Sequence, residues 1–337
     1  MPEDEKSKTD ENAKKSSRSG SSSRRKKATP KKVDSDASKA ETPTDSADSN
    51  ERTQKDKRRA SGSRRSSGSG RSSAADVPQD RKPTVTYVRA LKGKRPIVAL
   101  TAYDAPMAKL VSDAGADLLL VGDSVGTTHL GFETTVPITL DAMVHHVGAA
   151  RRGNPDCLLV ADLPFGEASL SFDRLLLASR RLMQEAGADA VKVEGGRDLA
   201  DDVERLVNTG VPVLGHVGLQ PQMVKTLGGY RKFANDREEA ENLFADAVSL
   251  EEAGCFAIVA EMVREEVAAE LARVLQVPLI GIGSGDGCDG QIIVTPDILG
   301  LTPGPTPSFV KPYADLSRQA AGALASFVRD VREKRYP

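Results

Sequence analysis

Residues 190–215, with the sequence AVKVEGGRDLADDVERLVNTGVPVLG, contain one complete repeat of the pattern that decides the fold. A short apolar run at 190–193 is followed by an amphipathic stretch at 199–208 and a second apolar run at 211–215. Gly210 stands where the helix would end, because glycine readily adopts the left-handed conformation that closes a helix. The stretch therefore predicts a strand, a helix and a second, parallel strand.

The same alternation runs from Pro96 onward and gives eight predicted strands. They lie at 97–102, 117–121, 157–161, 190–193, 211–215, 256–260, 277–282 and 292–295. The predicted helices lie at 105–114, 140–151, 172–186, 199–208, 237–253, 265–275 and about 314–334. Eight such units in about 250 residues are typical of a (β/α)8 TIM barrel, which is an α/β fold. A doubly wound open sheet is the alternative, but no G-x-G-x-x-G motif follows the first strand.

The first 80 residues differ from the rest of the chain in composition. They contain 20 Lys and Arg against 14 Asp and Glu, 18 Ser, and no Leu, Ile or aromatic residue. Such a segment has too little apolar surface to offset the entropy of ordering, so residues 1–80 are predicted to be a disordered tail. Residues 81–337 are predicted to form the catalytic TIM-barrel domain. The basic clusters of the tail favour at most weak nucleic-acid binding, since acids are interspersed and aromatic stacking residues are absent.

Charge, hydropathy and cysteine content exclude several classes of protein. The formal net charge of −1 combines +6 in residues 1–80 with −7 in the remainder, so it indicates no particular partner. No apolar run reaches the ~18–20 residues that a membrane span needs, and no apolar signal segment follows the basic N-terminus. Cys157, Cys255 and Cys288 are odd in number and are predicted to be reduced structural thiols. A cytoplasmic protein without a membrane partner is expected.

Polar residues interrupt the apolar runs at the far ends of successive predicted strands. These are Asp123 and Ser124 after the second strand, Asp162 after the third, Lys192 and Glu194 in the fourth, His216 after the fifth and Glu261 after the sixth. In a TIM barrel the active site lies at the C-terminal ends of the strands. The sequence therefore predicts that these side chains meet at one mouth of the barrel.

Four carboxylates at one mouth require compensating cations, because buried charges are rarely left unpaired. Lys192 supplies one positive charge, and a divalent metal is the simplest further source. Oxygen ligands alone suit Mg²⁺ better than zinc, and the chain has only four histidines, of which His145 and His146 are adjacent. His216 is equally compatible with a core position and with a site position, since its role depends on the partner of its second ring nitrogen.

The strand-end motifs, taken together, resemble those of one enzyme family. They are L-T-A-Y-D at 100–104, V-G-D-S at 121–124, A-D-L-P-F at 161–165, V-K-V-E-G-G at 191–196, G-H-V-G-L at 215–219 and D-G-Q at 289–291. Their order and separation resemble the ketopantoate hydroxymethyltransferase family over about residues 84–314. Two departures stand out: Met262-Val263-Arg264 follows Glu261 where a Cys-Val-Pro-like sequence is expected, and Gln220 replaces the more usual Thr.

The resemblance implies a Mg²⁺-dependent enzyme of pantothenate and coenzyme A biosynthesis. It would transfer a one-carbon unit from 5,10-methylenetetrahydrofolate to 3-methyl-2-oxobutanoate and give 2-dehydropantoate. It also implies a homo-oligomer, often a decamer. The residues that match the family's functional positions are Asp123, Asp162 and Glu194 for the metal, Asp123, Ser124, Asp162 and Lys192 for the 2-oxo acid, and Glu261 for the general base.

The residue types agree with this chemistry, and two other functions stay open. A chelated metal stabilises an enolate, a separate carboxylate removes the proton, and a lysine pairs with the substrate carboxylate. A related Mg²⁺-dependent lyase acting on 2-oxo or dicarboxylic acids would use the same enolate stabilisation, and a cysteine near a strand end would favour it. A non-catalytic scaffold with a nucleic-acid-binding tail would show salt-dependent binding that is lost when residues 1–80 are removed.

Overall fold

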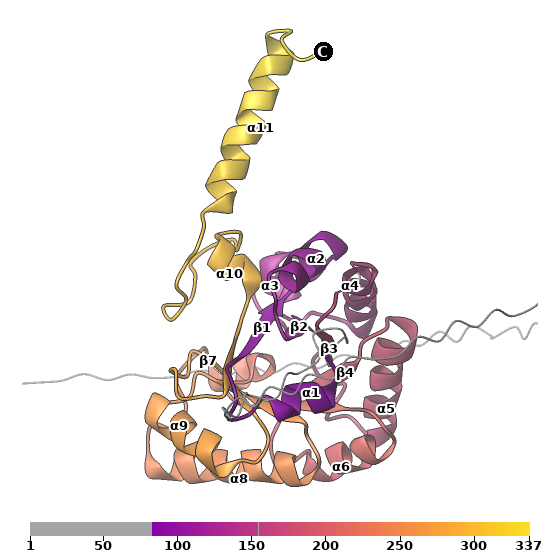
Figure 1. The fold of residues 1–337 in the computed structure, drawn as a ribbon, viewed down its shortest axis with the longest axis vertical. Coiled ribbons are helices and arrows are strands. Elements are labelled where there is room, and N and C mark those ends of the chain that lie inside the picture. The colour runs from indigo at the N-terminus through magenta and orange to yellow at the C-terminus, as the bar shows by residue number, and fades with distance from the viewer. Residues whose placement is uncertain (1–82, 154) are drawn as a thin grey trace, which may run out of the picture. The chain divides into compact units, whose positions relative to one another are not determined.

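The computed structural model describes residues 83–153 and 155–337, which contain a closed barrel of eight parallel strands (Figure 1). The strands follow one another in chain order, and the first pairs with the last. They are β1 Ile97–Thr101, β2 Leu118–Val121, β3 Leu158–Asp162, β4 Ala190–Glu194, β5 Val213–Gly218, β6 Ala257–Glu261, β7 Leu279–Ile282 and β8 Gly290–Ile293. The predicted TIM barrel is confirmed, whereas the disorder predicted for residues 1–80 lies outside the described residues.

Alternate residues of each strand serve two separate cores. Leu118 and Leu120 of β2 belong to the cluster that fills the barrel, whereas Leu119 and Val121 belong to the cluster between strands and helices. A strand buried on both faces must be apolar at nearly every position, which explains the uninterrupted apolar runs. Because side chains alternate across a strand, every second residue of each run faces the barrel axis.

Six longer helices cover the outside of the barrel. They are α2 Ala105–Asp113, α4 Leu140–Arg152, α5 Phe172–Arg180, α6 Ala200–Asn208, α8 Arg237–Glu252 and α9 Glu265–Val274. Asp104, Thr139 and Asp236 cap α2, α4 and α8 by accepting a hydrogen bond from a backbone N–H of the first turn. The helix predicted for 172–186 is correct in extent, but its final turn, Arg181–Glu185, is a π-helix.

The short elements at the two ends of the barrel were missed by the sequence analysis. Helix α1, Val85–Ala90, places Val88 in the interior core and covers the N-terminal ends of the strands. Short helices α3 Val125–Thr128, η2 Pro221–Met223, α7 Val224–Leu227 and α10 Thr295–Leu299 lie in the connections. The strand predicted for 292–295 is wrong at both bounds: β8 occupies Gly290–Ile293, and α10 begins at Thr295, where Pro296 fits the first helical turn.

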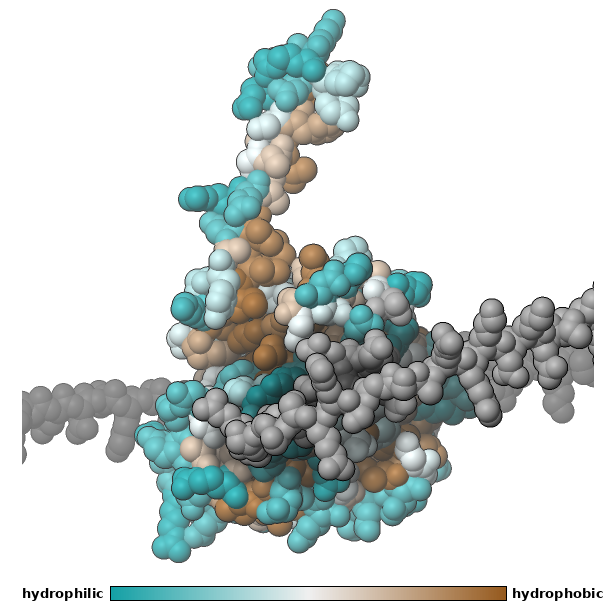
Figure 2. All heavy atoms as spheres, viewed as in Figure 1, coloured by the Kyte–Doolittle hydropathy of each residue, from teal (hydrophilic) through white to brown (hydrophobic). Residues whose placement is uncertain are grey.

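Two connections depart from the regular repeat of strands and helices. Residues 283–289 join β7 to β8 as a loop, and α11, Leu316–Arg332, follows the short helix α10. The helix predicted at about 314–334 is therefore present, but none of its residues is buried within this chain. Figure 2 shows apolar side chains along α11, and the exposed residues there include Leu324, Phe327 and Val331.

The described residues contain neither a membrane-spanning helix nor a disulfide. No helix there is long and apolar enough to cross a membrane. Cys157 and Cys255 are buried and Cys288 is half-buried, with no disulfide among residues 83–337. Burial raises the pKa of the Cys255 thiol to about 12 and that of Cys288 to about 11. Both thiols are therefore protonated near neutral pH, as expected for structural cysteines.

Candidate active site

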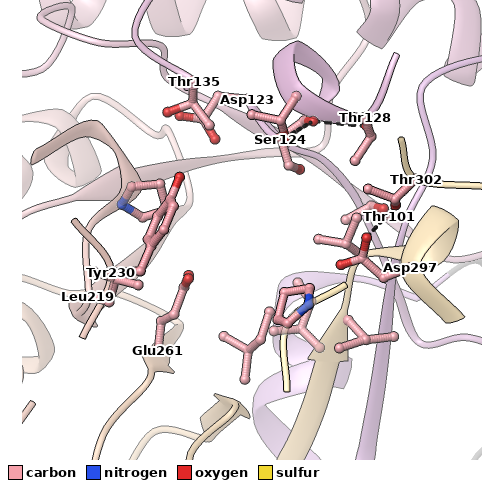
Figure 3. Close-up of a pocket in the computed structure, with 18 of the residues that line it drawn as sticks. Thr101, Asp123, Ser124, Thr128, Thr135, Leu219, Tyr230, Glu261, Asp297 and Thr302 are labelled. Carbon is pink, nitrogen blue, oxygen red and sulfur yellow. Dashed lines mark hydrogen bonds between the residues drawn. The ribbon is translucent and has the colours of Figure 1, made fainter. Parts of the chain in front are cut away.

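A cavity of about 750 Å³ opens at the C-terminal end of the barrel (Figure 3). Every residue predicted for the site lines it: Asp123, Ser124, Asp162, Lys192, Glu194 and Glu261. His216 lines the cavity as well. Of the core position and the site position that the sequence left open, the structure therefore shows the site position. None of the three cysteines lines this cavity; each immediately precedes a strand or lies in the loop before one.

Strand alternation explains why these side chains point inward. On β4 the interior residue Ala190 is followed at two-residue intervals by Lys192 and Glu194. The same spacing leads from Leu214 to His216 on β5 and from the interior residues of β3 to Asp162. The polar residues are therefore the last members of the interior rows, placed where the barrel opens.

Three carboxylates lie together at the centre of the site, and we call Asp123, Asp162 and Glu194 the acidic triad. Each offers an oxygen atom, and these atoms lie within 4.8 Å of one another. Lys192 pairs with two of them: its Nζ lies 2.8 and 2.7 Å from the two oxygens of Asp162 and 3.2 Å from Oε1 of Glu194. Asp123 has no such cation within hydrogen-bond distance among the described residues.

The three carboxyl groups of the acidic triad have different pKa values because burial and neighbouring charges affect each of them differently. Burial raises the pKa of Asp123 well above its ordinary value, and the charges of Asp162 and Glu194 raise it further. Burial also raises the pKa of Asp162, although Lys192 opposes this. At Glu194 burial is outweighed by Lys192 and His216, which lower the pKa to about 2. The charge of Lys192 therefore does not compensate burial and repulsion at Asp123, and a cation bound by the triad would supply further positive charge.

Gln222 connects parts of the site that are distant in sequence, and sequence reasoning assigned it no role. Its backbone N–H donates to Oε2 of Glu194 over 3.2 Å. Its side-chain Nε2 donates to Oδ2 of Asp123 over 3.3 Å and to the carbonyl of Leu163 over 2.8 Å. The sequence signal was its position directly after Pro221, in the connection that follows β5.

His216 lies between two carboxylates on neighbouring strands. Its Nδ1 is 3.6 Å from Oε1 of Glu194, and its Nε2 is 3.3 Å from Oε2 of Glu261. Both contacts are within ion-pair distance, but neither ring nitrogen has a partner in hydrogen-bond geometry. Burial and Lys192 act to lower the pKa of His216, and the two carboxylates outweigh them and raise it to about 9. His216 therefore adds a second positive charge to the site near neutral pH.

The backbone around Glu261 is fixed by a close approach of β5 and β6. Gly218 adopts a φ of 88°, and a Cβ added there would lie 2.3 Å from the carbonyl oxygen of Glu261, so only glycine fits. Met262 has a φ of 53°, its N–H donates to Ile282, and its carbonyl accepts from Phe233. The unusual Met-Val-Arg sequence after Glu261 is thus accommodated by a defined turn.

Two tyrosines complete the surroundings of the acids. Tyr103 is buried, and its hydroxyl is 2.8 Å from the hydroxyl of Ser124; burial raises its pKa to about 12. Tyr230 is more than half exposed and follows Gly228 and Gly229, both at positive φ. Figure 3 shows Tyr230 and Glu261 projecting into the same side of the cavity as Asp123. Tyr103 therefore orients Ser124, whereas Tyr230 borders the opening.

The acidic triad fits a hard divalent cation. Its donors are carboxylate oxygens from three separate strands or strand ends, and burial and the other two carboxylates raise the pKa of one of them, Asp123. Mg²⁺ and Ca²⁺ take oxygen ligands of this kind, whereas zinc sites use nitrogen and sulfur donors more often. No cysteine reaches the cavity, so the donor set favours the harder ions.

Comparison with known proteins identifies the family of this barrel. The family model described as ketopantoate hydroxymethyltransferase matches residues 82–337. The chain belongs to this family. A relative from Thermus thermophilus, named 3-methyl-2-oxobutanoate hydroxymethyltransferase, is 49% identical over 254 residues, which cover 75% of this chain and 97% of that protein. A relative of the same name from Halalkalibacterium halodurans is 45% identical over 256 residues, covering 76% and 92%. Members of the ketopantoate hydroxymethyltransferase family are transferases, so this barrel is an enzyme.

Solved structures with little sequence identity share the barrel. A putative phosphonomutase from Burkholderia cenocepacia has a TM-score of 0.52 at 16% identity, covering 73% of this chain and 97% of that one. A 2,3-dimethylmalate lyase has a TM-score of 0.50 at 17% identity, covering 74% and 88%. At such low identity these likenesses concern the fold alone.

Proposed function

We propose that this enzyme transfers a hydroxymethyl group from 5,10-methylenetetrahydrofolate to 3-methyl-2-oxobutanoate and forms 2-dehydropantoate, with Mg²⁺ bound by Asp123, Asp162 and Glu194. The observation that carries the proposal is one cavity in which the acidic triad and the separate carboxylate of Glu261 lie on either side of His216. The names of the relatives at 44–49% identity support the reaction and the pathway.

Mg²⁺ at the acidic triad would act as a Lewis acid on the 2-oxo group and lower the barrier to removal of the adjacent proton. The side chains of Asp123 and Asp162 then face the end of the substrate that carries the 2-oxo group and its carboxylate. Lys192, already charged because its partners outweigh burial and raise its pKa, is placed to pair with that carboxylate. The hydroxyl of Ser124, oriented by Tyr103, is placed to donate to the same group.

Glu261 is assigned as the general base that takes the proton from C3 of the 2-oxo acid. It lies on β6, away from the acidic triad, and 17% of its side chain is exposed, so it can accept and release a proton. Its neighbour His216 places Nε2 3.3 Å from one of its oxygens, within ion-pair distance. Water would hydrolyse the methylene bridge of the donor, so that its oxygen joins the one-carbon unit as formaldehyde and its two hydrogens replace the two broken C–N bonds on the released tetrahydrofolate. The carbanion at C3 would then attack this carbon, and the proton on Glu261 would return to the alkoxide, which becomes the hydroxyl group of 2-dehydropantoate.

The test is exchange of the C3 proton of 3-methyl-2-oxobutanoate with D₂O, followed by NMR without any folate. We expect the wild type to exchange in the presence of Mg²⁺ and Glu261→Gln to be slower by about 10³-fold, within the range of general-base effects. Glu266→Gln on the exposed surface of α9 is the matched control and should exchange like the wild type. If Glu261→Gln exchanges the proton as fast as the wild type, Glu261 is not the general base. If exchange does not depend on added metal, the proposed role of Mg²⁺ is wrong.

The lyase alternative is less well supported. A cysteine at a C-terminal strand end would have favoured it, but Cys157 and Cys255 precede β3 and β6, and Cys288 precedes β8. Assays for cleavage of branched 2-hydroxy dicarboxylic acids should therefore show no turnover above a no-enzyme blank, whereas hydroxymethyl transfer should proceed.

We also propose that the enzyme is a homo-oligomer, as the family resemblance implies. The apolar side chains of α11 are largely exposed: Leu324 is 66% exposed, and Phe327, which contacts only the ring of Tyr336 among the aromatic residues described, is 49% exposed. A contiguous apolar helix face of this kind is typical of surfaces that are buried on association. Light scattering coupled to size-exclusion chromatography measures the mass directly, and a monomer at micromolar concentration would contradict the proposal.

A further inference from the structure

The cavity has a second polar end that the proposed chemistry does not use. A cavity of about 750 Å³ lies within the range that holds drug-sized ligands, and a small branched 2-oxo acid occupies only part of it. Figure 3 shows Asp297, Thr302 and Thr101 on one side of the cavity, with Asp123, Tyr230 and Glu261 on the other. The space beside Asp297 is therefore available to the second substrate.

Asp297 is a buried carboxylate with unused hydrogen-bonding capacity. It lies in α10, directly after β8, and only 7% of its surface is exposed. The hydroxyl of Thr302 donates to Oδ1, and within residues 83–337 no donor reaches Oδ2, which points into the cavity (Figure 3). No Lys or Arg side chain of the described part forms an ion pair with it. Burial accordingly raises the pKa of Asp297. A buried acceptor of this kind calls for a ligand that donates hydrogen bonds.

The cavity that contains Asp297 also has apolar side chains suited to a flat ring. Phe132 and Phe309 line the cavity and are 41% and 36% exposed. Three prolines from the loop after α10, Pro303, Pro305 and Pro307, line it as well. Aromatic and proline side chains present broad apolar surfaces, and proline restricts the backbone that carries them. Stiff apolar surfaces, together with the free oxygen of Asp297, match a planar heterocycle that has hydrogen-bond donors along one edge.

We propose that the carboxylate of Asp297 binds the aminopyrimidinone edge of the reduced pterin of the one-carbon donor, with N3–H and the 2-amino group donating to it. The ring then lies among Phe132, Phe309 and the loop prolines. That the ligand is the one-carbon donor depends on the function proposed above. The position of Asp297 in the cavity is independent of that function. A second 2-oxo acid is disfavoured here because its carboxylate would meet Asp297 without an intervening cation.

Thr302 acts as the positioning residue for Asp297. Its hydroxyl holds Oδ1, and the loop that carries it is anchored by backbone bonds from Leu301 to Pro296 and from Tyr313 to Ile298. The carboxylate is therefore oriented before the ligand arrives, which limits the ordering cost of binding. Its two oxygens are sufficient for a bidentate contact, because Oδ1 can accept a second hydrogen bond.

The experiment compares wild type, Asp297→Asn and the surface control Asp286→Asn with two donors. One donor is 5,10-methylenetetrahydrofolate, and the other is its analogue with a methyl group in place of the 2-amino group. We expect Asp297→Asn to raise the KM for the natural donor about 10- to 100-fold, the size of a lost hydrogen bond to a charged group, and Asp286→Asn to leave it unchanged. For the wild type, the KM for the analogue should exceed the KM for the natural donor by a similar factor. For Asp297→Asn, the two KM values should be nearly equal.

Exchange of the C3 proton without donor separates this proposal from the proposed function. If the wild type neither exchanges nor transfers, the function itself is wrong. If exchange proceeds in all three proteins but Asp297→Asn keeps the wild-type KM, or the wild type accepts the analogue equally well, the assignment of Asp297 is wrong. The analogue comparison needs only the wild type, so it decides the matter even if Asp297→Asn fails to fold. GMP has the same N–H and 2-amino donors along one edge of its ring. If GMP inhibits the reaction at a lower concentration than tetrahydrofolate does, the ligand of Asp297 is a purine and not the pterin.

Discussion

Acidic side chains at the two ends of the barrel are neutralised in different ways. At the N-terminal end, Arg95 donates to both oxygens of Asp117 at 2.6 and 2.8 Å, and Lys92 pairs with Asp289. Each of these aspartates also accepts a backbone N–H at the start of a strand, from Val98 or Leu279. Each of these two aspartates therefore has its own cation and its own backbone donor, which is the arrangement of a structural ion pair.

At the C-terminal end, four carboxylates share two cationic side chains. Asp123, Asp162, Glu194 and Glu261 face Lys192 and His216. The pKa of Asp123 is raised because burial and the charges of Asp162 and Glu194 outweigh the attraction of Lys192. At the N-terminal end, the charges of the acids are compensated by side chains of the protein itself. At the C-terminal end, negative charge remains in excess until a ligand brings positive charge. Groups held in such unbalanced surroundings mark functional sites.

The largest expected change comes from removing Lys192. Lys192→Met leaves Asp162 and Glu194 buried without their cation, and we expect the free energy of unfolding to fall by about 3–5 kcal/mol. Lys109→Met is the control, since Lys109 pairs with Asp113 on the exposed face of α2 and should leave stability unchanged. Urea unfolding followed by circular dichroism measures both. Equal stability of Lys192→Met and wild type would show that the acids are not charged in the folded protein.

A smaller loss is expected at the opposite end. Asp117→Asn weakens the double contact with Arg95, and unfolding should become easier by about 1–3 kcal/mol. Because Asp117 lies at the start of β2, C3 exchange and the KM for the 2-oxo acid should not change. A raised KM would contradict the separation of the two ends. Unchanged stability would mean that the Arg95 contact is as weak as an ordinary surface pair.

The comparison also explains how far the sequence could predict this molecule. Strands and site acids were predictable because both depend on local pattern: buried strands are apolar at every position, and the interior row of β4 ends in Lys192 and Glu194. The barrel rule then places residues from distant parts of the chain at one mouth. Helix α1 was missed because it is short and only Val88 is buried, so its periodicity is too weak to recognise.

The remainder of the site depends on contacts that no local pattern encodes. Gln222 lies 99 residues from Asp123, to which it donates, and the hydroxyls of Tyr103 and Ser124 meet across separate strand ends. Asp297 could have been found, because it follows β8 closely and the strand-end rule had assigned no residue to that strand. It was missed because the strand was expected to run to Thr295, where α10 begins instead.

The smallest expected effect has the opposite sign from the first two. Asp123→Asn removes a carboxyl group that burial and its neighbours make costly to ionise, so without divalent metal we expect the variant to be more stable by about 1–2 kcal/mol at pH 8. Unfolding in urea with EDTA measures it, with Asp286→Asn as the surface control. A variant less stable than wild type at every pH would mean that the charge of Asp123 is already compensated.

The pH dependence of this difference follows from the raised pKa of Asp123. In the unfolded chain the carboxyl group ionises near pH 4, whereas in the folded protein it resists ionisation to higher pH. Its contribution to stability is therefore fully present below about pH 4 and is lost as the pH rises through the folded pKa. Asparagine does not titrate, so the advantage of Asp123→Asn should grow from pH 4.5 to pH 8. Mg²⁺ at 100 times its Kd should stabilise the wild type by about 2.7 kcal/mol and the variant by less, because the cation then compensates the charge of ionised Asp123. The wild type should therefore become the more stable of the two proteins.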